Sequence, residues 1–145
     1  MTGILSAQEL RKKIAIAEGE KASAAMKKLS AAEAEKKALL DKMSRPSGLS
    51  DDEVLEKASI IINRAVENGL SAVQVYRFPH TLCTDNGRAI NQAEEGWEKT
   101  LTGIPKEIYE FWLRQLKQRG YHIRYEIVDY PGGMPGDVGI ILTWA

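Results

Sequence analysis

The chain of 145 residues is long enough for one domain of ordinary size and too short for two separate hydrophobic cores joined by a linker. Hydrophobic residues make up 43% of it and charged residues 28%, which is usual for soluble globular proteins and excludes collagen-like, disordered and disulfide-scaffold classes. Twenty Lys and Arg residues balance twenty Asp and Glu residues, so no net charge attracts the protein to nucleic acid or to an anionic membrane. We therefore expect neither nucleic acid nor a membrane as a partner.

The cysteine count and the apolar runs suggest the cellular setting. Cys83 is the single cysteine and cannot form a disulfide within the chain, so nothing requires an oxidising compartment. The longest apolar runs, such as residues 138–142, are far shorter than the roughly 20 residues needed to span a bilayer. Residues 1–8 lack the basic stretch followed by an apolar stretch that marks a secretory signal. We expect a soluble, cytoplasmic protein.

The first third of the chain has the composition of a long helix. Residues 6–43 are rich in Ala, Lys and Glu, contain no Pro and open with the capping box Ser6 to Glu9. At about 1.5 Å per residue this helix would be roughly 57 Å long, whereas the remaining chain would fold into a body roughly 30 Å across. We therefore predict a helical arm over residues 1–45, a linker over 46–50 and a body over 51–145. The arm has ten basic and six acidic residues, a net charge of +4, and the rest of the chain carries −4.

The apolar positions of the arm form a thin stripe with spacings of three, four and sometimes seven or eight residues. Strict heptads would place Lys21 and Lys28 in the seam, so the pattern does not favour a left-handed coiled coil. A solvated mobile helix, docking onto another subunit or a larger assembly, and self-association all remain open, and docking is the interpretation we favour. The residues expected at this interface are Leu10, Ile14, Met26, Leu29, Leu39 and Met43.

A breaker cluster at residues 45–49 separates the arm from a second predicted helix. Ser50 to Glu53 form another capping box, a wide apolar stripe of helical period follows, and Asn68-Gly69 ends it. Residues 72–78 are rich in Val and aromatic side chains and stop at Pro79, which is typical of a short strand.

The segment between residues 79 and 104 has the least regular pattern. One helix would align its apolar residues, although Gly96 weakens that prediction. The residues concerned are Ile90, Ala93, Trp97 and Leu101.

The last forty residues predict a helix followed by a hairpin. An amphipathic stretch begins at Pro105 and ends at Gly120. Residues 121–127 and 138–144 alternate apolar and polar side chains on either side of a Pro- and Gly-rich turn. The predicted class is α+β: a long helical arm and a compact α-β-(α)-α-β-β body, with a three-stranded mixed sheet and helices on one face.

Four segments of the body resemble a pattern in small uncharacterised proteins of bacteriophages and bacterial genomes. That pattern has a helix ending at Gly, a short Val-rich strand, a helix ending Gly-Tyr and a last strand ending in an aliphatic residue, one spacer and Trp. The resemblance implies a virion or assembly component with a capsid or tail assembly as its partner, and it brings no catalytic residue. The segments are residues 61–69, 71–75, 116–123 and 141–144.

A cluster of reactive and charged residues follows the first predicted strand, where α/β folds often place sites. Cys83 could act as a nucleophile if His80 or His122 served as its base and Asp85 oriented that base. His80, Cys83 and Asp85 also supply three potential zinc ligands, but without a paired metal-binding spacing. A pocket for an anion or for a partner's carboxylate is the third interpretation. Its ligand-binding residues would be Arg77, Arg88 and Asn91.

An ordinary structural interpretation of the same segment is the one we favour. Cys83 would be a small buried hydrophobe, Thr84 or Asp85 would cap a turn or a helix, Asn86-Gly87 would form the turn itself, and Arg88 would pair with Asp85 or a chain end. We therefore expect a non-enzymatic structural or interaction protein without a cofactor or metal, binding a protein partner or another copy of itself through the arm. The alternative is a small cytoplasmic enzyme or an anion-binding protein that uses residues 77–91.

Overall fold

The computed structural model describes residues 6–144 of the chain. The contacts divide the chain into two compact units, Met1–Leu40 and Asp41–Ala145. The first unit consists of most of one long helix, and the second is an α+β body, so the predicted fold class is confirmed.

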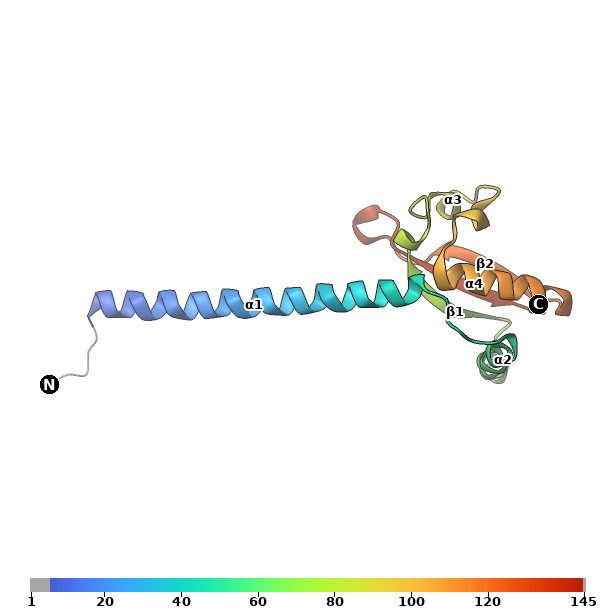
Figure 1. Cartoon of the computed structure of the whole chain (residues 1–145), viewed down its shortest axis with the longest axis horizontal. Helices are drawn as coiled ribbons and strands as arrows, with labels where there is room; N and C mark the ends of the chain where they lie inside the picture. The colour runs from blue at the N-terminus through green and yellow to red at the C-terminus, as the bar shows by residue number, and fades with distance from the viewer. Residues whose placement is uncertain (1–5, 145) are drawn as a thin grey trace. The chain divides into compact units, whose positions relative to one another are not determined.

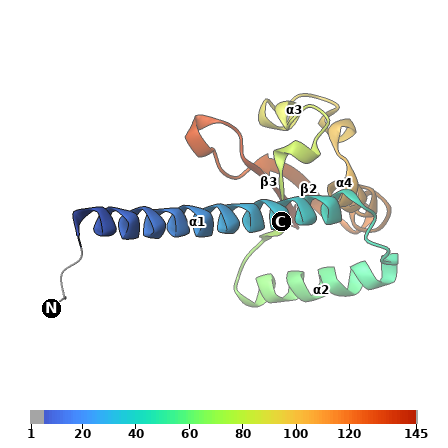
Figure 2. The ribbon, with the colours of Figure 1, turned by 60° about the vertical axis from the view of Figure 1, so that its left-hand side comes forward.

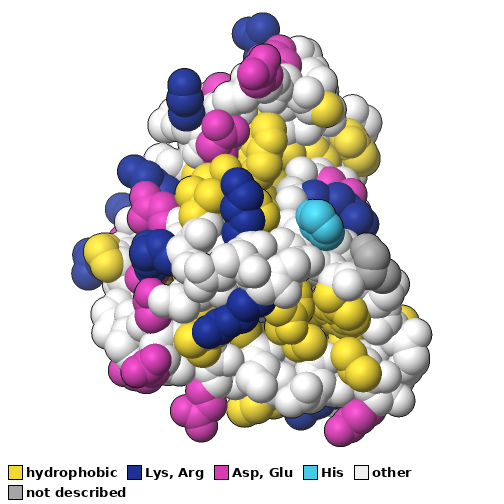
Figure 3. All heavy atoms as spheres, turned by 90° about the vertical axis from the view of Figure 1, so that its right-hand side faces the viewer, with side chains coloured by type: hydrophobic (Ala, Val, Ile, Leu, Met, Phe, Trp, Pro, Cys, Tyr) yellow, Lys and Arg dark blue, Asp and Glu magenta, His cyan; other side chains and the backbone are white. Residues whose placement is uncertain are grey.

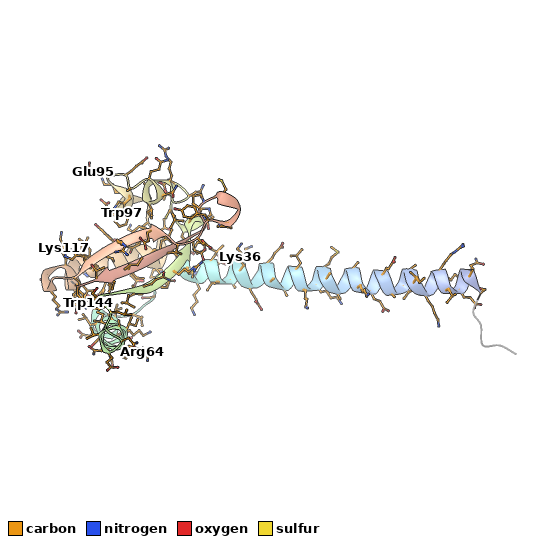
Figure 4. All side chains as sticks on the ribbon, turned by 180° about the vertical axis from the view of Figure 1, so that it is seen from behind. Lys36, Arg64, Glu95, Trp97, Lys117 and Trp144 are labelled. Carbon is orange, nitrogen blue, oxygen red and sulfur yellow. The ribbon has the colours of Figure 1, made fainter. Side chains whose placement is uncertain are left out.

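The long helix α1 spans Ala7–Ser44, 38 residues without interruption (Figure 1). The predicted capping box starts it, because the Glu9 amide donates to Ser6 Oγ at 3.1 Å and the Ser6 amide donates to Glu9 Oε2 at 3.2 Å. None of its residues is buried. Side chains project from every side of the helix, Lys36 among them (Figure 4).

Helix α2 spans Asp51–Glu67 and begins with the second predicted capping box, in which the Glu53 amide donates to Ser50 Oγ at 3.3 Å. Its wide apolar stripe is only partly covered, since Ile62 and Ala65 are its buried residues. Asn68 caps the carboxyl end, as predicted.

The predicted helix from Pro105 to Gly120 is a composite of three helical types. Helix α4 covers Gly103–Phe111, continues as the π-helical segment η3 (Trp112–Leu116) and ends in the 3-10 turn η4 (Lys117–Arg119). At its end Arg114 Nη2 and Gln115 Nε2 donate to the two carboxylate oxygens of Asp51, at 2.9 and 3.0 Å. These bonds fix the end of this helix to the start of α2, and they hold the pKa of the Asp51 carboxyl below its usual value.

The prediction of a single helix around residues 90–101 is wrong. Helix α3 covers only Arg88–Asn91, and the 3-10 turn η2 covers Trp97–Thr100. Between them Ala93 has φ 51° and Gly96 has φ 82°, and two left-handed residues so close together break any continuous helix. Ile90 and Leu101 are nevertheless buried.

Three strands form the sheet: β1 (Ala72–Pro79), β2 (His122–Ile127) and β3 (Asp137–Thr143). Their spatial order is β1-β3-β2, and β3 is antiparallel to both neighbours. The predicted mixed sheet is therefore wrong. The final strand inserts between β1 and β2, which run in the same direction but never pair, so the sheet has no parallel ladder.

Helices α2 and α4 cover one face of this sheet. Leu142 faces Val73 on one side and Ile123 on the other, and residues opposite each other in antiparallel strands share a face. That face packs against Ile62 of α2 and Phe111 of α4. The same face carries Val138 and Ile140, whose side chains are fully inaccessible to solvent. The core therefore lies between β3 and the helices.

The far end of the same face is closed by aromatic side chains. The Tyr125 ring lies 6.1 Å from that of Phe78, 5.0 Å from that of Trp97 and 6.3 Å from that of Tyr109. Its hydroxyl donates to the Pro105 carbonyl at 2.7 Å. This bond joins β2 to the first turn of α4, and burial raises the pKa of the Tyr125 hydroxyl strongly.

Candidate functional site

The residues predicted for a chemical site after β1 have separate partners. Arg77 Nε lies 2.8 Å from Asp137 Oδ2, and Arg77 Nη2 lies 3.1 Å from Asp129 Oδ2. Arg88 Nη2 lies 3.7 Å from Glu94 Oε1, and within residues 6–144 Arg88 forms no ion pair with Asp85. The hydroxyl of Tyr130 donates to Asn91 Oδ1 at 3.0 Å. The side chains proposed for an anion site are thus already paired with groups of the same chain.

The cysteine has the environment of a core residue. Cys83 is 3% exposed, and burial raises the pKa of its thiol, which disfavours the nucleophilic thiolate. The His80 ring binds the Gly136 carbonyl through Nδ1 at 2.9 Å, so this nitrogen is a donor. No hydrogen bond between either histidine side chain and Cys83 is found in the described part of the chain.

Of the two caps that the structural interpretation left open, Thr84 and Asp85, it is Asp85 that caps the turn. Its carboxylate accepts from the amides of Gly87 at 3.0 Å and Ala89 at 2.9 Å. Asn86, with φ 58°, and Gly87, with φ 81°, form the turn between them. Within residues 6–144, no three His, Cys, Asp or Glu side chains gather in a geometry that could hold a metal ion.

An apolar groove of about 330 Å³ opens on the helical side of the body. Its floor comes from the sheet and its walls from α2 and α4. The two helices cross steeply: α2 is seen nearly end-on in Figure 1, where α4 lies lengthwise, and the reverse holds in Figure 2. The lining of the groove includes Val54, Ala58 and Ile61 of α2, Ile104, Ile108 and Phe111 of α4, Trp112 and Leu116 of η3, and Val75, Ile123 and Leu142 of the sheet.

Polar groups occur mainly at the rim of this groove. The Glu107 carboxylate accepts from the amide of Ser47 at 3.1 Å and from its hydroxyl at 2.8 Å, so this acid is already engaged. Lys57 is exposed at the rim, and Tyr76, whose hydroxyl pKa is raised by burial, also lines the groove. The lining of this groove is therefore mainly apolar, with Lys57 and Glu107 as its charged side chains.

The sequence prediction missed this groove. The apolar stripe of α2 was a signal in the sequence, because it is wider than packing against a single neighbouring element requires. The volume of the groove, however, depends on how α2, α4 and the sheet are placed relative to one another. Figure 3 shows hydrophobic side chains gathered in patches between charged ones on one face of the body. The π-helical turn η3 was also unexpected. It widens the helix where Trp112 lines the groove and donates Nε1 to the Tyr121 carbonyl at 3.0 Å.

The stripe predicted on the arm is uncovered over most of its length. At 100° per residue, Leu10, Ile14, Leu29 and Leu39 fall within a sector of about 100°. Their exposed fractions run from 47% to 61%. Met26, at 72% exposed, lies about 60° outside that sector. We call the four residues Leu10, Ile14, Leu29 and Leu39 the α1 stripe.

Two residues of α1 differ from the others. Met43 is half-buried, its carbonyl lies against Gly103, and it falls within the second unit. The second unit begins at Asp41, whereas the predicted arm ends at residue 45. Ile16, which the prediction left out, is 62% exposed on another side of α1.

Comparison of the chain with family models, with curated proteins and with solved structures finds no match. The resemblance to small phage and bacterial proteins therefore stays a prediction. No helix within residues 6–144 combines the length and the apolar character that crossing a bilayer requires.

Proposed function

We propose that the protein is a non-enzymatic interaction protein that docks into a larger assembly through the α1 stripe. The observation that supports this role is a continuous 38-residue helix with no buried residue that exposes Leu and Ile side chains at helical spacing. Full burial of each such side chain contributes about 1.5–3 kcal/mol. Covering the stripe would therefore supply several kcal/mol to an association.

The pairing of the residues after β1 supports the same choice over the enzymatic alternative. Cys83 is buried, Asp85 caps a turn and Arg77 is engaged by two carboxylates. The setting we propose is the cytoplasm, or a capsid or tail assembly if the chain is encoded by a phage.

Photocrosslinking of the full-length chain tests this role. A photoreactive amino acid placed at position 14 or 29 lies on the α1 stripe, and one placed at position 23 or 34 lies on the opposite side of the helix. We expect adducts of higher mass from the stripe positions and few from the control positions.

Paired substitutions provide the matched control. Ile14→Asp with Leu29→Asp should abolish assembly and leave the tryptophan signal of the body unchanged. Ser23→Asp with Ala34→Asp adds the same charge to the opposite side of α1 and should have little effect. Equal adduct yields from both sides of the helix, or assembly that survives the stripe substitutions, would overturn the proposed function.

A further inference from the structure

We propose that the partner of α1 is a second copy of the chain, and this proposal rests on the proposed function. The apolar groove of one copy binds the Leu10–Ala17 segment of α1 from the other. Each chain then carries one donor segment and one acceptor groove. Two copies that exchange segments form a closed dimer, whereas a one-way contact continues into a ring or a filament.

The shape of the donor suits the groove. Leu10, Ile14 and Ala17 stand at positions i, i+4 and i+7, which is the pattern of anchors that helices present to hydrophobic grooves. Leu10 and Ile14 are 47% and 57% exposed, and nothing within the described chain covers them. A groove of about 330 Å³ lies at the small end of binding pockets and has room for a few aliphatic side chains.

The lining of the groove is the apolar surface that such anchors need. Ala58 on α2 is small and half-buried, so the wall of the groove recedes where it stands. Ile61 and Ile108 face the groove from the two helices, and Leu142 lies on its floor. A helix entering there would complete the cover of a core that α2 and α4 leave partly open.

Charge complementarity favours a second copy over an unrelated partner. Helix α1 carries nine basic and six acidic residues, and three of the basic ones, Arg11, Lys12 and Lys13, lie beside the anchors. Helix α2 carries five acidic and two basic residues, whereas α4 together with its continuation η3 carries two acidic and two basic residues. The donor helix is therefore net positive, the α2 wall of the groove is net negative and the α4 wall is neutral, and the attraction between α1 and α2 speeds and orients association.

Complementation between two full-length variants tests the proposal. Ile14→Asp destroys the donor segment and leaves the groove intact, whereas Ala58→Phe fills the groove and leaves the donor intact. In sedimentation velocity the wild-type chain should self-associate, each variant alone should associate at least roughly tenfold more weakly, and an equimolar mixture should form a one-to-one dimer that grows no further. High salt should weaken association of the wild type.

A disulfide experiment covers the case in which Ala58→Phe fails to fold. Full-length Ile14→Cys and Lys57→Cys chains are mixed and oxidised, with Ala34→Cys replacing Ile14→Cys as the control. We expect the mixed disulfide from position 14 and at least roughly tenfold less from position 34, because only position 14 would approach the groove rim.

The outcomes separate this inference from the proposed function. Two outcomes would overturn the groove as the binding site and leave the docking role of α1 standing. In the first, self-association persists in Ala58→Phe but is lost in Ile14→Asp. In the second, the wild-type chain is monomeric while its α1 stripe crosslinks to another protein. An Ile14→Asp chain that assembles as the wild type does overturns both. Two further outcomes would overturn the second copy as the occupant of the groove. One is a chain with cysteines at both positions 14 and 57 that forms only an internal disulfide. The other is a protein that forms no dimer and releases an apolar small molecule from the groove on denaturation.

Discussion

Burial determines the chemistry of the single cysteine. Cys83 packs among the core residues of the segment after β1, and the loss of solvent around it raises the pKa of its thiol. A higher pKa means a smaller thiolate fraction at any given pH, and the thiolate is the reactive species. Burial therefore shifts this thiol toward its protonated, less reactive form.

Alkylation of the wild-type chain with iodoacetamide measures this effect. Near pH 8 we expect the folded protein to react at least roughly tenfold more slowly than the same chain in denaturant, because both access and thiolate formation are suppressed. The folded rate should keep rising with pH above the ordinary thiol value of 9.0. Fast labelling of the folded chain below pH 7 would contradict the buried-thiol interpretation and favour the catalytic one.

At the scale of elements, a single glycine allows the end of α1 to approach α4. Gly103 has φ +59°, and a β-carbon there would overlap the Met43 carbonyl oxygen and come within 2.7 Å of Ser44 Cα. The obstacle is backbone, which cannot rotate away as a side chain would. Only a residue without a side chain fits between the end of α1 and the start of α4.

Gly103→Ala should therefore cost about 2–4 kcal/mol of the free energy of unfolding, from left-handed strain plus overlap with backbone. Urea unfolding followed by tryptophan fluorescence gives the value. Gly48→Ala is the matched control, since Gly48 has φ +74° with nothing within 4 Å of the added carbon. It should cost about 1 kcal/mol from strain alone. Equal losses in the two variants would show that the backbone contact is not restrictive.

Elements with a complete local signal were predictable, and those that depend on distant contacts were not. The capping boxes at Ser6 and Ser50 and the stop at Asn68 were visible because capping involves neighbouring residues. The strand order was not, because Val73 pairs with Leu142 through backbone groups that every residue has. The left-handed conformation of Ala93 has no local signature either, so a helix was expected there.

The same distinction between local signals and distant contacts applies to the candidate site. The α1 stripe was predictable from spacing, and the exposure of Ile14 and Leu29 agrees with it. The groove was not, because it is space left between elements whose relative placement no short sequence window encodes. The pairing of Arg77 with Asp129 and Asp137 was hidden for the same reason, since the partners are more than fifty residues apart.

At the scale of the whole molecule, the two units draw their stability from different sources. The body has a core of packed side chains between β3 and the helices, in which Val138 and Ile140 are fully inaccessible. Helix α1 has no buried residue and depends on helix propensity and its cap. Helices without tertiary packing melt gradually, whereas packed cores melt cooperatively. Two spectroscopic probes should therefore report two different transitions.

The chain contains the probes already. Trp97, Trp112 and Trp144 all lie in the second unit, and α1 has no aromatic residue, so tryptophan fluorescence reports the body alone. On heating dilute protein in high salt, where the association proposed above would be weakest, we expect the far-ultraviolet helical signal to decline before the sharp fluorescence transition. Gly19→Ala raises helix propensity by about 1 kcal/mol at a site with open space around it, so it should delay the first decline and leave the fluorescence midpoint unchanged. Coincident transitions, shifted together by that substitution, would mean that the arm folds as part of the body. If α1 docks as proposed, the early decline should move toward the cooperative transition at high protein concentration and low salt, because docked α1 would gain cover that the isolated chain does not give it.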